Sequence, residues 1–391
     1  MIARIVFVIL LVLFLPQLYL DYYKYRQDKL WVRILHWLST LAMMGVTVVL
    51  AFESDFVPYD MTVMNIYLIV LFLIFVPKAI YVLCSMLGKF ARKTFHTRYN
   101  WGNAVGLFLG ACVVFIVAYG SFIGVRKLDV NRMEISIPDL PEAFDGYRIV
   151  VFSDAHVGSF TGWREQLLKR DFDSINAQKP DAIFFVGDLQ NMRPIELYPV
   201  RAILNSLEAR DGVFSVLGNH DYSDYIDDDP AVKAANEREI VNRQRWFGWT
   251  PLLNGHVVLK RGATKERLVI AGVECNASRG DLPKVRTDVA KALRGVRPDD
   301  CVILLQHDPT NWRLETNSDP RVKLTLSGHT HGGQVSLFGF RPTELRFPEN
   351  YGLYREGDHQ LYVTSGIGGL IPFRFGVSPE IAVITLRRMN H

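Results

Sequence analysis

Four long apolar stretches occupy the first third of this chain, and they restrict its possible folds more than any other feature. Each is close to the roughly 20 residues that a helix needs to cross a bilayer core. A signal peptide is a poor explanation for the first stretch, because no small-x-small cleavage site precedes Tyr22 and Tyr23. Buried core helices are the other alternative, but such helices rarely run this long without a polar stripe. We therefore expect membrane helices at Ile5–Leu20, Ile34–Ala51, Val63–Leu87 and Ala104–Val125.

Basic residues in the connecting loops predict how these helices are oriented. The second loop, Phe52–Asp60, contains no Lys or Arg, and Lys78 can extend toward the third loop. The positive-inside rule then places the first and third loops in the cytoplasm and both ends of the membrane region outside. We expect a multi-pass integral protein of the bacterial cytoplasmic (inner) membrane, with the rest of the chain periplasmic or extracellular. Arg126, Lys127 and Arg132 oppose this orientation. The loop residues that support it are Lys24, Arg26, Lys29, Arg33, Lys89, Arg92, Lys93 and Arg98.

The charge divides the chain at the same place. Residues 1–128 contain 12 Lys+Arg and 5 Asp+Glu, a net of +7. Subtraction from the totals of 44 and 40 leaves 32 against 35, a net of −3, for residues 129–391. The positive charge therefore flanks the membrane, and no basic face for nucleic acid is indicated. The four cysteines show no Cys-x-x-Cys spacing and do not identify the compartment.

The composition and the apolar runs predict a membrane domain over 1–127, a linker over 128–145 and a further domain over 146–391. Within the linker, Asp129–Pro141 is expected to form a short connecting strand and turn. In the domain over 146–391, short apolar runs alternate with helix-like segments such as Arg164–Gln178 and Pro199–Ala209. Unbroken apolar runs indicate strands covered on both faces, and their alternation with helices indicates an α/β sheet. The runs are Arg148–Phe152, Ala182–Val186, Val213–Leu217, Cys301–Gln306, Lys323–Leu326, Leu361–Thr364 and Ile381–Leu386.

Polar side chains directly follow the first five of these runs. Ligands of open α/β sheets bind beyond the carboxyl ends of the strands, so we expect these side chains to converge. A lone histidine at a strand end is usually structural or solvated. Five of the ten histidines at equivalent places, with two aspartates and an asparagine, are too many for that explanation. The residues are Asp154, His156, Asp188, Asn219, His220, His307, His329 and His331.

The donor types of this set favour a metal centre. Imidazole nitrogen with carboxylate and amide oxygen, without thiolate, suits Mn, Fe, Zn or Ni and does not suit a structural zinc site. The pair Asp154 and His156 points to one side if the backbone is extended, and a sharp loop would aim the two at different ions. Even seven of these eight donors are too many for one ion. Two divalent ions that share a carboxylate, roughly 3.5–4 Å apart, are the economical solution.

Taken in order, these groups of donor residues at the strand ends resemble the motifs of the calcineurin-like metallophosphoesterase superfamily. The resemblance extends over Gly146–Leu386. The block Gly328–Gln334 and the closing segment Pro372–Glu380 look most like its membrane-associated branch, which includes the YkuE and YaeI phosphoesterases. The multispan N-terminal region is similar to vertebrate transmembrane proteins with a metallophosphoesterase domain. The resemblance implies an α/β fold, a four-layer αββα metallophosphoesterase sandwich preceded by four transmembrane helices.

The resemblance also implies a hydrolase of phosphomonoesters or phosphodiesters that holds two divalent metal ions, with manganese among the candidates. Asp188 would bridge the two ions, and His220 would protonate the leaving oxygen or stabilise the phosphoryl oxygens. Asp221 would orient His220. Arg374 could clamp a second phosphate group, although an arginine at the rim of the core is an equal alternative. The remaining ligands would be Asp154, His156 and His331 for the first metal, and Asn219, His307 and His329 for the second.

Several questions about the substrate stay open at this point. We expect a membrane or envelope component, with lipid-linked phosphoesters among the candidates. Leu337–Phe340 and Leu370–Phe375 would form a lip toward the bilayer or simply fill the core. A sugar-nucleotide pyrophosphatase of the UDP-diacylglucosamine type is the alternative, although such relatives usually carry Arg in place of His220. A non-catalytic membrane scaffold would usually have lost ligands, and this chain has kept them. The acidic run Asp224–Asp229 is interpreted as a solvated loop.

Overall fold

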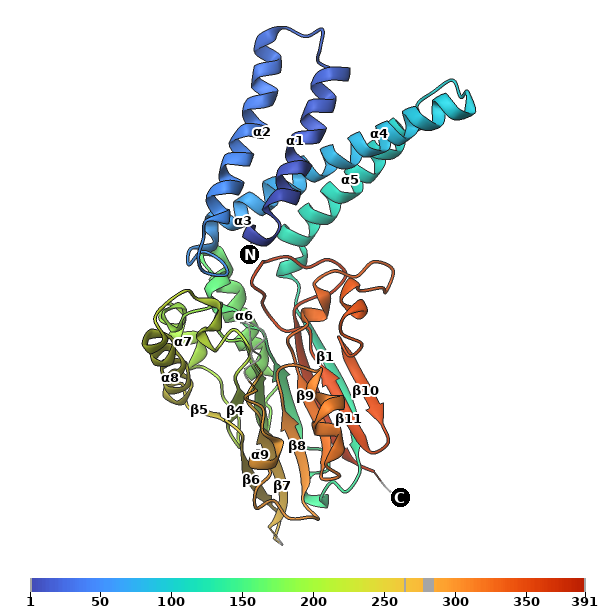
Figure 1. The fold of residues 1–391 in the computed structure, drawn as a ribbon. Helices are drawn as coiled ribbons and strands as arrows, with labels where there is room; N and C mark the ends of the chain where they lie inside the picture. Colours follow the sequence, from blue (N-terminus) through green and yellow to red (C-terminus); the bar gives the residue numbers. More distant parts are fainter. Residues whose placement is uncertain (1, 264, 277–284, 390–391) are drawn as a thin grey trace. The chain divides into compact units, whose positions relative to one another are not determined.

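The computed structural model describes residues 2–263, 265–276 and 285–389, and the chain divides into two compact units, Met1–Ile123 and Gly124–His391 (Figure 1). The first unit is helical. Within the described residues, four of its helical segments are long and apolar enough to cross a membrane, which confirms the four predicted spans. The third is a single run of 35 residues, because α3 and α4 are joined by a π-helical turn at Leu71–Phe75. The helices are α1 (Val6–Tyr23), α2 (Leu30–Ala51), α3 (Met61–Val70), α4 (Val76–Phe95) and α5 (Trp101–Phe122).

Lys78 on α4 does not extend toward the third loop as its sequence position indicated. Its ammonium donates to the Gln17 side-chain oxygen on α1 and, at 3.4 Å, to the Thr40 hydroxyl on α2. Gln17 and Thr40 are both fully buried. An ammonium within a bilayer core is costly unless polar groups of neighbouring helices satisfy it. These hydrogen bonds therefore join three helices of the first unit.

The second unit is built on two six-stranded sheets. The first sheet has the order β1-β12-β2-β3-β4-β5, in which β2 to β5 run parallel. The second has the order β10-β11-β9-β8-β7-β6, in which β11, β9, β8 and β7 run parallel. The strands are β1 (Asp129–Ile137), β2 (Arg148–Phe152), β3 (Ala182–Val186), β4 (Val213–Val216), β5 (Trp249–Pro251), β6 (Gly255–Arg261), β7 (Glu266–Gly272), β8 (Cys301–Leu305), β9 (Val322–Ser327), β10 (Gly352–Glu356), β11 (His359–Val363) and β12 (Glu380–Arg388).

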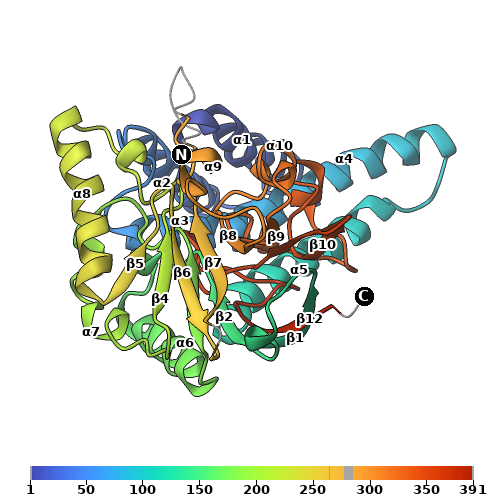
Figure 2. The ribbon, with the colours of Figure 1, turned by 90° about the horizontal axis from the view of Figure 1, so that it is seen from below.

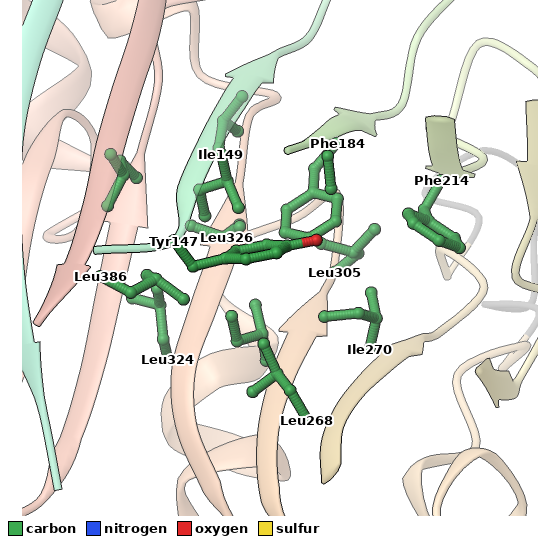
Figure 3. Close-up of a cluster of buried hydrophobic side chains, with 14 of the residues drawn as sticks. Tyr147, Ile149, Phe184, Phe214, Leu268, Ile270, Leu305, Leu324, Leu326 and Leu386 are labelled. Atoms are coloured by element: carbon green, nitrogen blue, oxygen red, sulfur yellow. The ribbon is translucent and has the colours of Figure 1, made fainter. Parts of the chain in front are cut away.

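The two sheets pack face to face around an apolar core (Figure 3). Ile149 and Phe184 from the first sheet meet Leu305 and Leu324 from the second, and Tyr147 lies among them. Burial of this surface is the main favourable contribution to the stability of the unit. The core also explains why the strand sequences lack a polar alternation, since their outer faces are covered as well.

Helices cover the outer face of each sheet, as Figure 2 shows for the first. Phe172 of α6 and Ile240 of α8 pack on Phe152 and Phe185. On the second sheet, Ala292 of α9 packs with Val302 and its neighbours. The four-layer αββα arrangement predicted from the resemblance is therefore confirmed. The helices are α6 (Glu165–Ala177), α7 (Arg201–Leu204), α8 (Pro230–Trp246), α9 (Val289–Ala292) and α10 (Asn311–Leu314).

Two segments differ from the sequence-based expectations. The region 128–145 was expected to be a linker with a short connecting strand, and that strand is β1, which pairs in parallel with β12 over its whole length and so belongs to the first sheet. The pattern of β1 is ambiguous because the strand lies at a sheet edge and is buried mainly at its end. The helix expected at Pro199–Ala209 is limited to α7, Arg201–Leu204.

Candidate metal centre

The predicted donors come together at the carboxyl ends of five strands. Three groups of side chains each bring one possible ligand atom per residue within 4.8 Å of the others. Asp188 belongs to two of these groups and His156 also to two, so the groups form one connected cluster. The groups are Asp154, His156 and His331, then His156, Asp188 and His220, and then Asp188, His307 and His329.

Asp188 lies between imidazoles from different strand ends. Its Oδ2 atom is 3.2 Å from His307 Nε2 and 3.6 Å from His156 Nε2. On one side of it, His331 Nε2 is 3.3 Å from Asp154 Oδ1. On the other, His329 Nδ1 is 3.3 Å from His307 Nε2. A carboxylate in this place can contact two neighbouring cations at once.

The loops that present these donors have an unusual backbone conformation. Asp154, His156, Asp188, His329 and His331 all have φ between 44° and 71°, a region that residues other than glycine rarely adopt. Each such conformation costs of the order of 1–3 kcal/mol and persists where the surrounding structure enforces it, typically at functional sites. Of the two alternatives that the sequence leaves open for Asp154 and His156, the structure therefore has the sharp loop. Sharp loops aim the donors.

Two glycines allow these loops to approach closely. A Cβ atom on Gly218 would lie 2.2 Å from Asp188 Oδ1, and one on Gly328 would lie 2.5 Å from Asp154 Oδ2. Real Cβ atoms do not come so near to other atoms. Any side chain at either position would displace a carboxylate of the cluster.

Several buried polar atoms of the cluster lack a hydrogen-bond partner among the described residues. They are Asp154 Oδ1, both ring nitrogens of His156, Asn219 Oδ1 and His331 Nδ1. Buried polar groups in folded proteins are almost always paired, so such a concentration of unpaired acceptors needs an explanation. Divalent cations fit this set, because the carboxylate and amide oxygens and one nitrogen of each neutral imidazole can offer a lone pair.

Hydrogen bonds on the far side of the donors fix their orientation. His307 Nδ1 lies 2.7 Å from the Val186 carbonyl oxygen, which turns Nε2 toward Asp188. Asp154 Oδ2 accepts from the His329 amide at 3.0 Å and from the Ser153 hydroxyl, while Oδ1 is left for another contact. Metal-binding histidines and carboxylates are typically held in this way.

Burial and charge set the protonation of the imidazoles. Burial lowers the pKa of His331 to about 4 and holds the pKa of His156 well below its usual value. Burial also opposes a charge on His307, but the Asp188 carboxylate raises the pKa of His307 to about 10. Neutral imidazoles are the form that binds metal, and a cation displaces the proton from a site such as His307 when it binds.

The sequence predicts that the ring of His220 is oriented by Asp221, which in the structure binds backbone amides. Its carboxylate accepts from four backbone amides, at 2.9 Å from Asp188, Gly218 and Leu189 and at 3.2 Å from Gln190. Burial, followed by the nearby Asp188 charge, raises the pKa of Asp221 to about 7. Asp221 therefore holds together the two loops that carry Asp188 and His220.

His220 is oriented by other groups. Its Nδ1 atom is 2.6 Å from the Asn191 carbonyl oxygen, and its ring stacks on Tyr225 with centroids 4.4 Å apart. The Tyr225 hydroxyl also accepts from Asn219 Nδ2 at 2.9 Å. Sequence reasoning missed Tyr225, since it lies in the acidic run that was expected to be a solvated loop and carries no motif of its own.

Arg374 is buried and its guanidinium is occupied by the protein itself. It donates to the carbonyl oxygens of His331 at 3.0 Å, Ser365 at 2.9 Å and Gly366 at 3.2 Å, and also to that of Gly368. These contacts tie the loop after β11 to the loop that carries His331. They differ from the phosphate clamp that was considered for Arg374.

Comparisons with known proteins agree with this geometry. A family model described as calcineurin-like phosphoesterase matches residues 147–333, and one described as probable calcineurin-like phosphoesterase, transmembrane domain, matches residues 3–125. The chain is 30% identical over 339 residues to a transmembrane protein with metallophosphoesterase domain from Danio rerio, covering 83% of this chain and 72% of that one. It is 31% identical over 278 residues to the uncharacterized metallophosphoesterase YkuE of Bacillus subtilis, covering 70% and 90%. An uncharacterized metallophosphoesterase of Aquifex aeolicus is 29% identical over 277 residues, covering 70% and 97%.

Proposed function

The chain belongs to the calcineurin-like phosphoesterase family, and on this premise we propose that it is a membrane-anchored hydrolase of phosphomonoesters or phosphodiesters that uses two divalent metal ions. One observation carries the proposal. The buried cluster contains three overlapping groups of donors, two of which share Asp188, and several of its acceptor atoms have no partner within the described residues. A dinuclear centre accounts for both features.

We infer the division of the ligands from two of the three groups. Asp154, His156 and His331 would hold the first ion. His307 and His329 would hold the second together with the unpaired Oδ1 of Asn219, and Asp188 would bridge. The nitrogen and oxygen donors suit Mn, Fe, Zn or Ni. When bound, the two ions supply a water of lowered pKa and neutralise charge on the phosphoryl oxygens.

The chain's own residues do the rest of the chemistry in this proposal. His220 lies within the group that also contains His156 and Asp188, so it stands at the edge of the cluster. Its Nδ1 contacts the Asn191 carbonyl oxygen, so Nδ1 carries a proton and Nε2 is the nitrogen that can give a proton to the leaving oxygen. Asp221 acts at a distance, by fixing the backbone on both sides of this group.

The substrate and the side of the membrane are the finer parts of the proposal. We infer a phosphoester of a membrane or envelope component, including lipid-linked esters, because the chain has four spans and the fourth runs directly into the second unit. The basic first and third loops favour a catalytic domain outside the cytoplasm of a bacterial inner membrane. A reporter fused after residue 391, active only in the periplasm, tests the orientation.

The hydrolase proposal is tested with the purified full-length protein. Stripped with a chelator and then supplied with Mn²⁺, it should hydrolyse a chromogenic phosphodiester or phosphomonoester. Asp188→Ala and His220→Ala should each reduce the rate by about 1,000-fold or more, because one removes the shared ligand and the other the proton donor. Asp173→Ala and His359→Ala are matched controls, since both residues lie outside the cluster. Full activity in both site variants would refute the proposal.

A further inference from the structure

A tight turn at Leu337–Phe340 presents bare apolar side chains. Its ends are closed by two backbone hydrogen bonds between Leu337 and Phe340, of 2.9 and 3.0 Å. Both central residues have positive φ, 53° at Phe338 and 87° at Gly339, as in the turn type that strongly prefers Asn-Gly. The Phe338 side chain is fully exposed. A phenylalanine in this conformation is strained and makes no compensating contact in water.

Other apolar groups accompany Phe338. Leu345, which follows within the same segment, is 84% exposed, and Phe340 is 49% exposed. Exposed apolar residues are ordinary when they are scattered, but a cluster of large ones marks an interaction site. Leu337, Phe338, Phe340 and Leu345 are called the apolar tip below.

Two arginines flank the apolar tip. Arg341 donates to Asn350 Oδ1 at 2.8 Å and lies over the Tyr351 ring, while Arg346 lies over the Phe347 ring. Arg341 is also paired with Glu344 at 3.2 Å. Aromatic residues beside arginines are typical of surfaces at the boundary between hydrocarbon and lipid headgroups, where the ring enters the apolar region and the cation stays among the phosphates.

Contacts inside the second unit place the apolar tip near the point where the chain leaves the membrane. The fourth span extends to Arg126 by its composition. Gly124 lies against the backbone of Arg374, so closely that a Cβ atom on Gly124 would be 1.7 Å from the Arg374 carbonyl oxygen. Val125 also lies beside Ile371 and Phe373. The segment around Arg374 is therefore adjacent to the end of the span.

The same segment is paired with the strand-like stretch that leads into the apolar tip. Ser336 donates to the Phe375 carbonyl oxygen at 2.7 Å, and Phe375 donates to that of Gln334 at 2.8 Å. Phe338 is three residues beyond Val335, the bridge partner of Phe375, so it lies within about 10 Å of this pair. The apolar tip therefore lies near the residues at which the fourth span ends.

We propose that the apolar tip inserts into the headgroup region of the lipid bilayer. It would hold the second unit at the membrane surface by a contact other than the covalent link to the fourth span. The Arg374 guanidinium donates to the carbonyl oxygen of His331, a proposed metal ligand. The segment that contains Arg374 is therefore in contact both with the stretch leading into the apolar tip and with the loop that carries His331. On the function proposed above, the arrangement selects phosphoesters that are presented at a bilayer surface.

Insertion is tested without reference to activity. Phe338→Cys is made in the full-length chain with Cys84→Ala and Cys112→Ala, labelled with a polarity-sensitive fluorophore, and reconstituted into nanodiscs of phosphatidylcholine and phosphatidylglycerol. The label should emit at shorter wavelength in nanodiscs than in detergent-free denaturant and should be quenched by spin-labelled lipid. Asp358→Cys, in the exposed β10–β11 turn, is the matched control and should be quenched by aqueous iodide instead.

Two results would overturn the proposal. One is a label at position 338 that iodide quenches as strongly as the label at position 358. The other is a shift that depends on protein concentration without quenching by spin-labelled lipid, which would assign the apolar tip to a second copy of the chain.

A kinetic comparison separates this proposal from the hydrolase proposal. Phe338→Ser with Leu345→Ser should lower kcat/KM for a vesicle-embedded phosphoester by about tenfold or more, because both apolar anchors are lost. The rate on a soluble chromogenic ester should stay unchanged. If the label at position 338 still inserts into the bilayer in a protein that also carries Asp188→Ala, the insertion proposal is supported even where hydrolysis is lost. Equal losses on both substrates would count against the role of the apolar tip in substrate selection.

Discussion

The ring of Tyr225 stacks on the imidazole of His220, with an angle of 15° between the two planes. The same tyrosine accepts a hydrogen bond from Asn219, whose other amide atom is one of the unpaired acceptors of the cluster. One residue without a motif thus contacts both the proposed proton donor and a proposed ligand. Its two contacts can be separated by substitution.

Tyr225→Phe keeps the stacked ring and removes the hydroxyl that Asn219 contacts. We expect kcat/KM to fall by about five- to tenfold, because a buried donor loses its partner at a cost of roughly 1–1.5 kcal/mol. Tyr225→Leu also removes the stacking and should lower kcat by about a further fivefold, corresponding to roughly 1 kcal/mol. Steady-state kinetics on a soluble ester give both values. Equal activity of the two variants would show that the ring has no positioning role.

Loss of one histidine should empty half of the metal centre. His331 belongs to the group with Asp154 and His156, whereas His307 and His329 form the other group with Asp188. His331→Ala should therefore reduce the metal content of the purified protein from about two ions per chain to about one. Elemental analysis after dialysis measures this, with His359→Ala as the control. Retention of two ions, or loss of both, would contradict the division of ligands.

Arg374→Met tests whether the guanidinium acts on the protein or on the substrate. The substitution removes a donor from four carbonyl oxygens, of which those of His331 and Gly366 keep a backbone donor, and we expect the unfolding free energy to fall by about 3 kcal/mol or more. The melting temperature of the full-length protein should drop by several degrees, while Arg374→Lys should recover part of the loss. A normal melting temperature combined with a raised KM would instead support the phosphate clamp considered from the sequence.

Asp171 predicts a pH dependence of stability that is independent of the metal centre. Burial raises the pKa of Asp171 to about 7, even though Arg170 contacts its carboxylate at 2.6 Å. The folded protein keeps this proton up to about pH 7, whereas the unfolded chain releases it near pH 4. The contribution of Asp171 is therefore favourable at low pH and is lost as the pH rises from about 4 to about 7.

Asp171→Asn removes this titration. Relative to the unchanged protein, the variant should gain stability on going from pH 5 to pH 8, by up to roughly 2.5–3 kcal/mol, because only the part of the titration above pH 5 is sampled. Chemical unfolding at the two pH values gives the difference. Parallel pH dependence in the two proteins would show that Asp171 is ionised in the fold.

The strand ends could be predicted because their local pattern is strong. Five unbroken apolar runs each stop at a donor residue, and the parallel strands of the sheets bring these ends to one edge. The conformation of the loops could not be predicted, since neither the residue types of Asp154 and His331 nor their neighbours in the sequence indicate a positive φ. Strands β6 and β10 were missed because they are only half buried and lack an apolar run.

Contacts to the backbone explain the remaining differences. Asp221 and Arg374 make their hydrogen bonds with amides and carbonyls of segments far away in the sequence, and such partners leave no trace in the side chains. A sequence motif identifies such a residue but does not show its hydrogen-bond partners. The sequence predicted that Asp221 acts on the imidazole, and it left a phosphate clamp and a place at the rim of the core as equal alternatives for Arg374. In the structure both residues bind the backbone of distant loops.

The parallel pairing of β1 with β12 has a consequence for biosynthesis. Asn131 of β1 donates to Glu380 of β12, 249 residues further along the chain, and β12 separates β1 from β2. A ribosome that adds ~5–20 residues per second takes on the order of 10–50 s to cover this distance. During that time β1 has no strand to pair with, and the edge of β2 that pairs with β12 has no hydrogen-bond partner. Chaperones that bind nascent chains would therefore have to protect these two strands for the longest time.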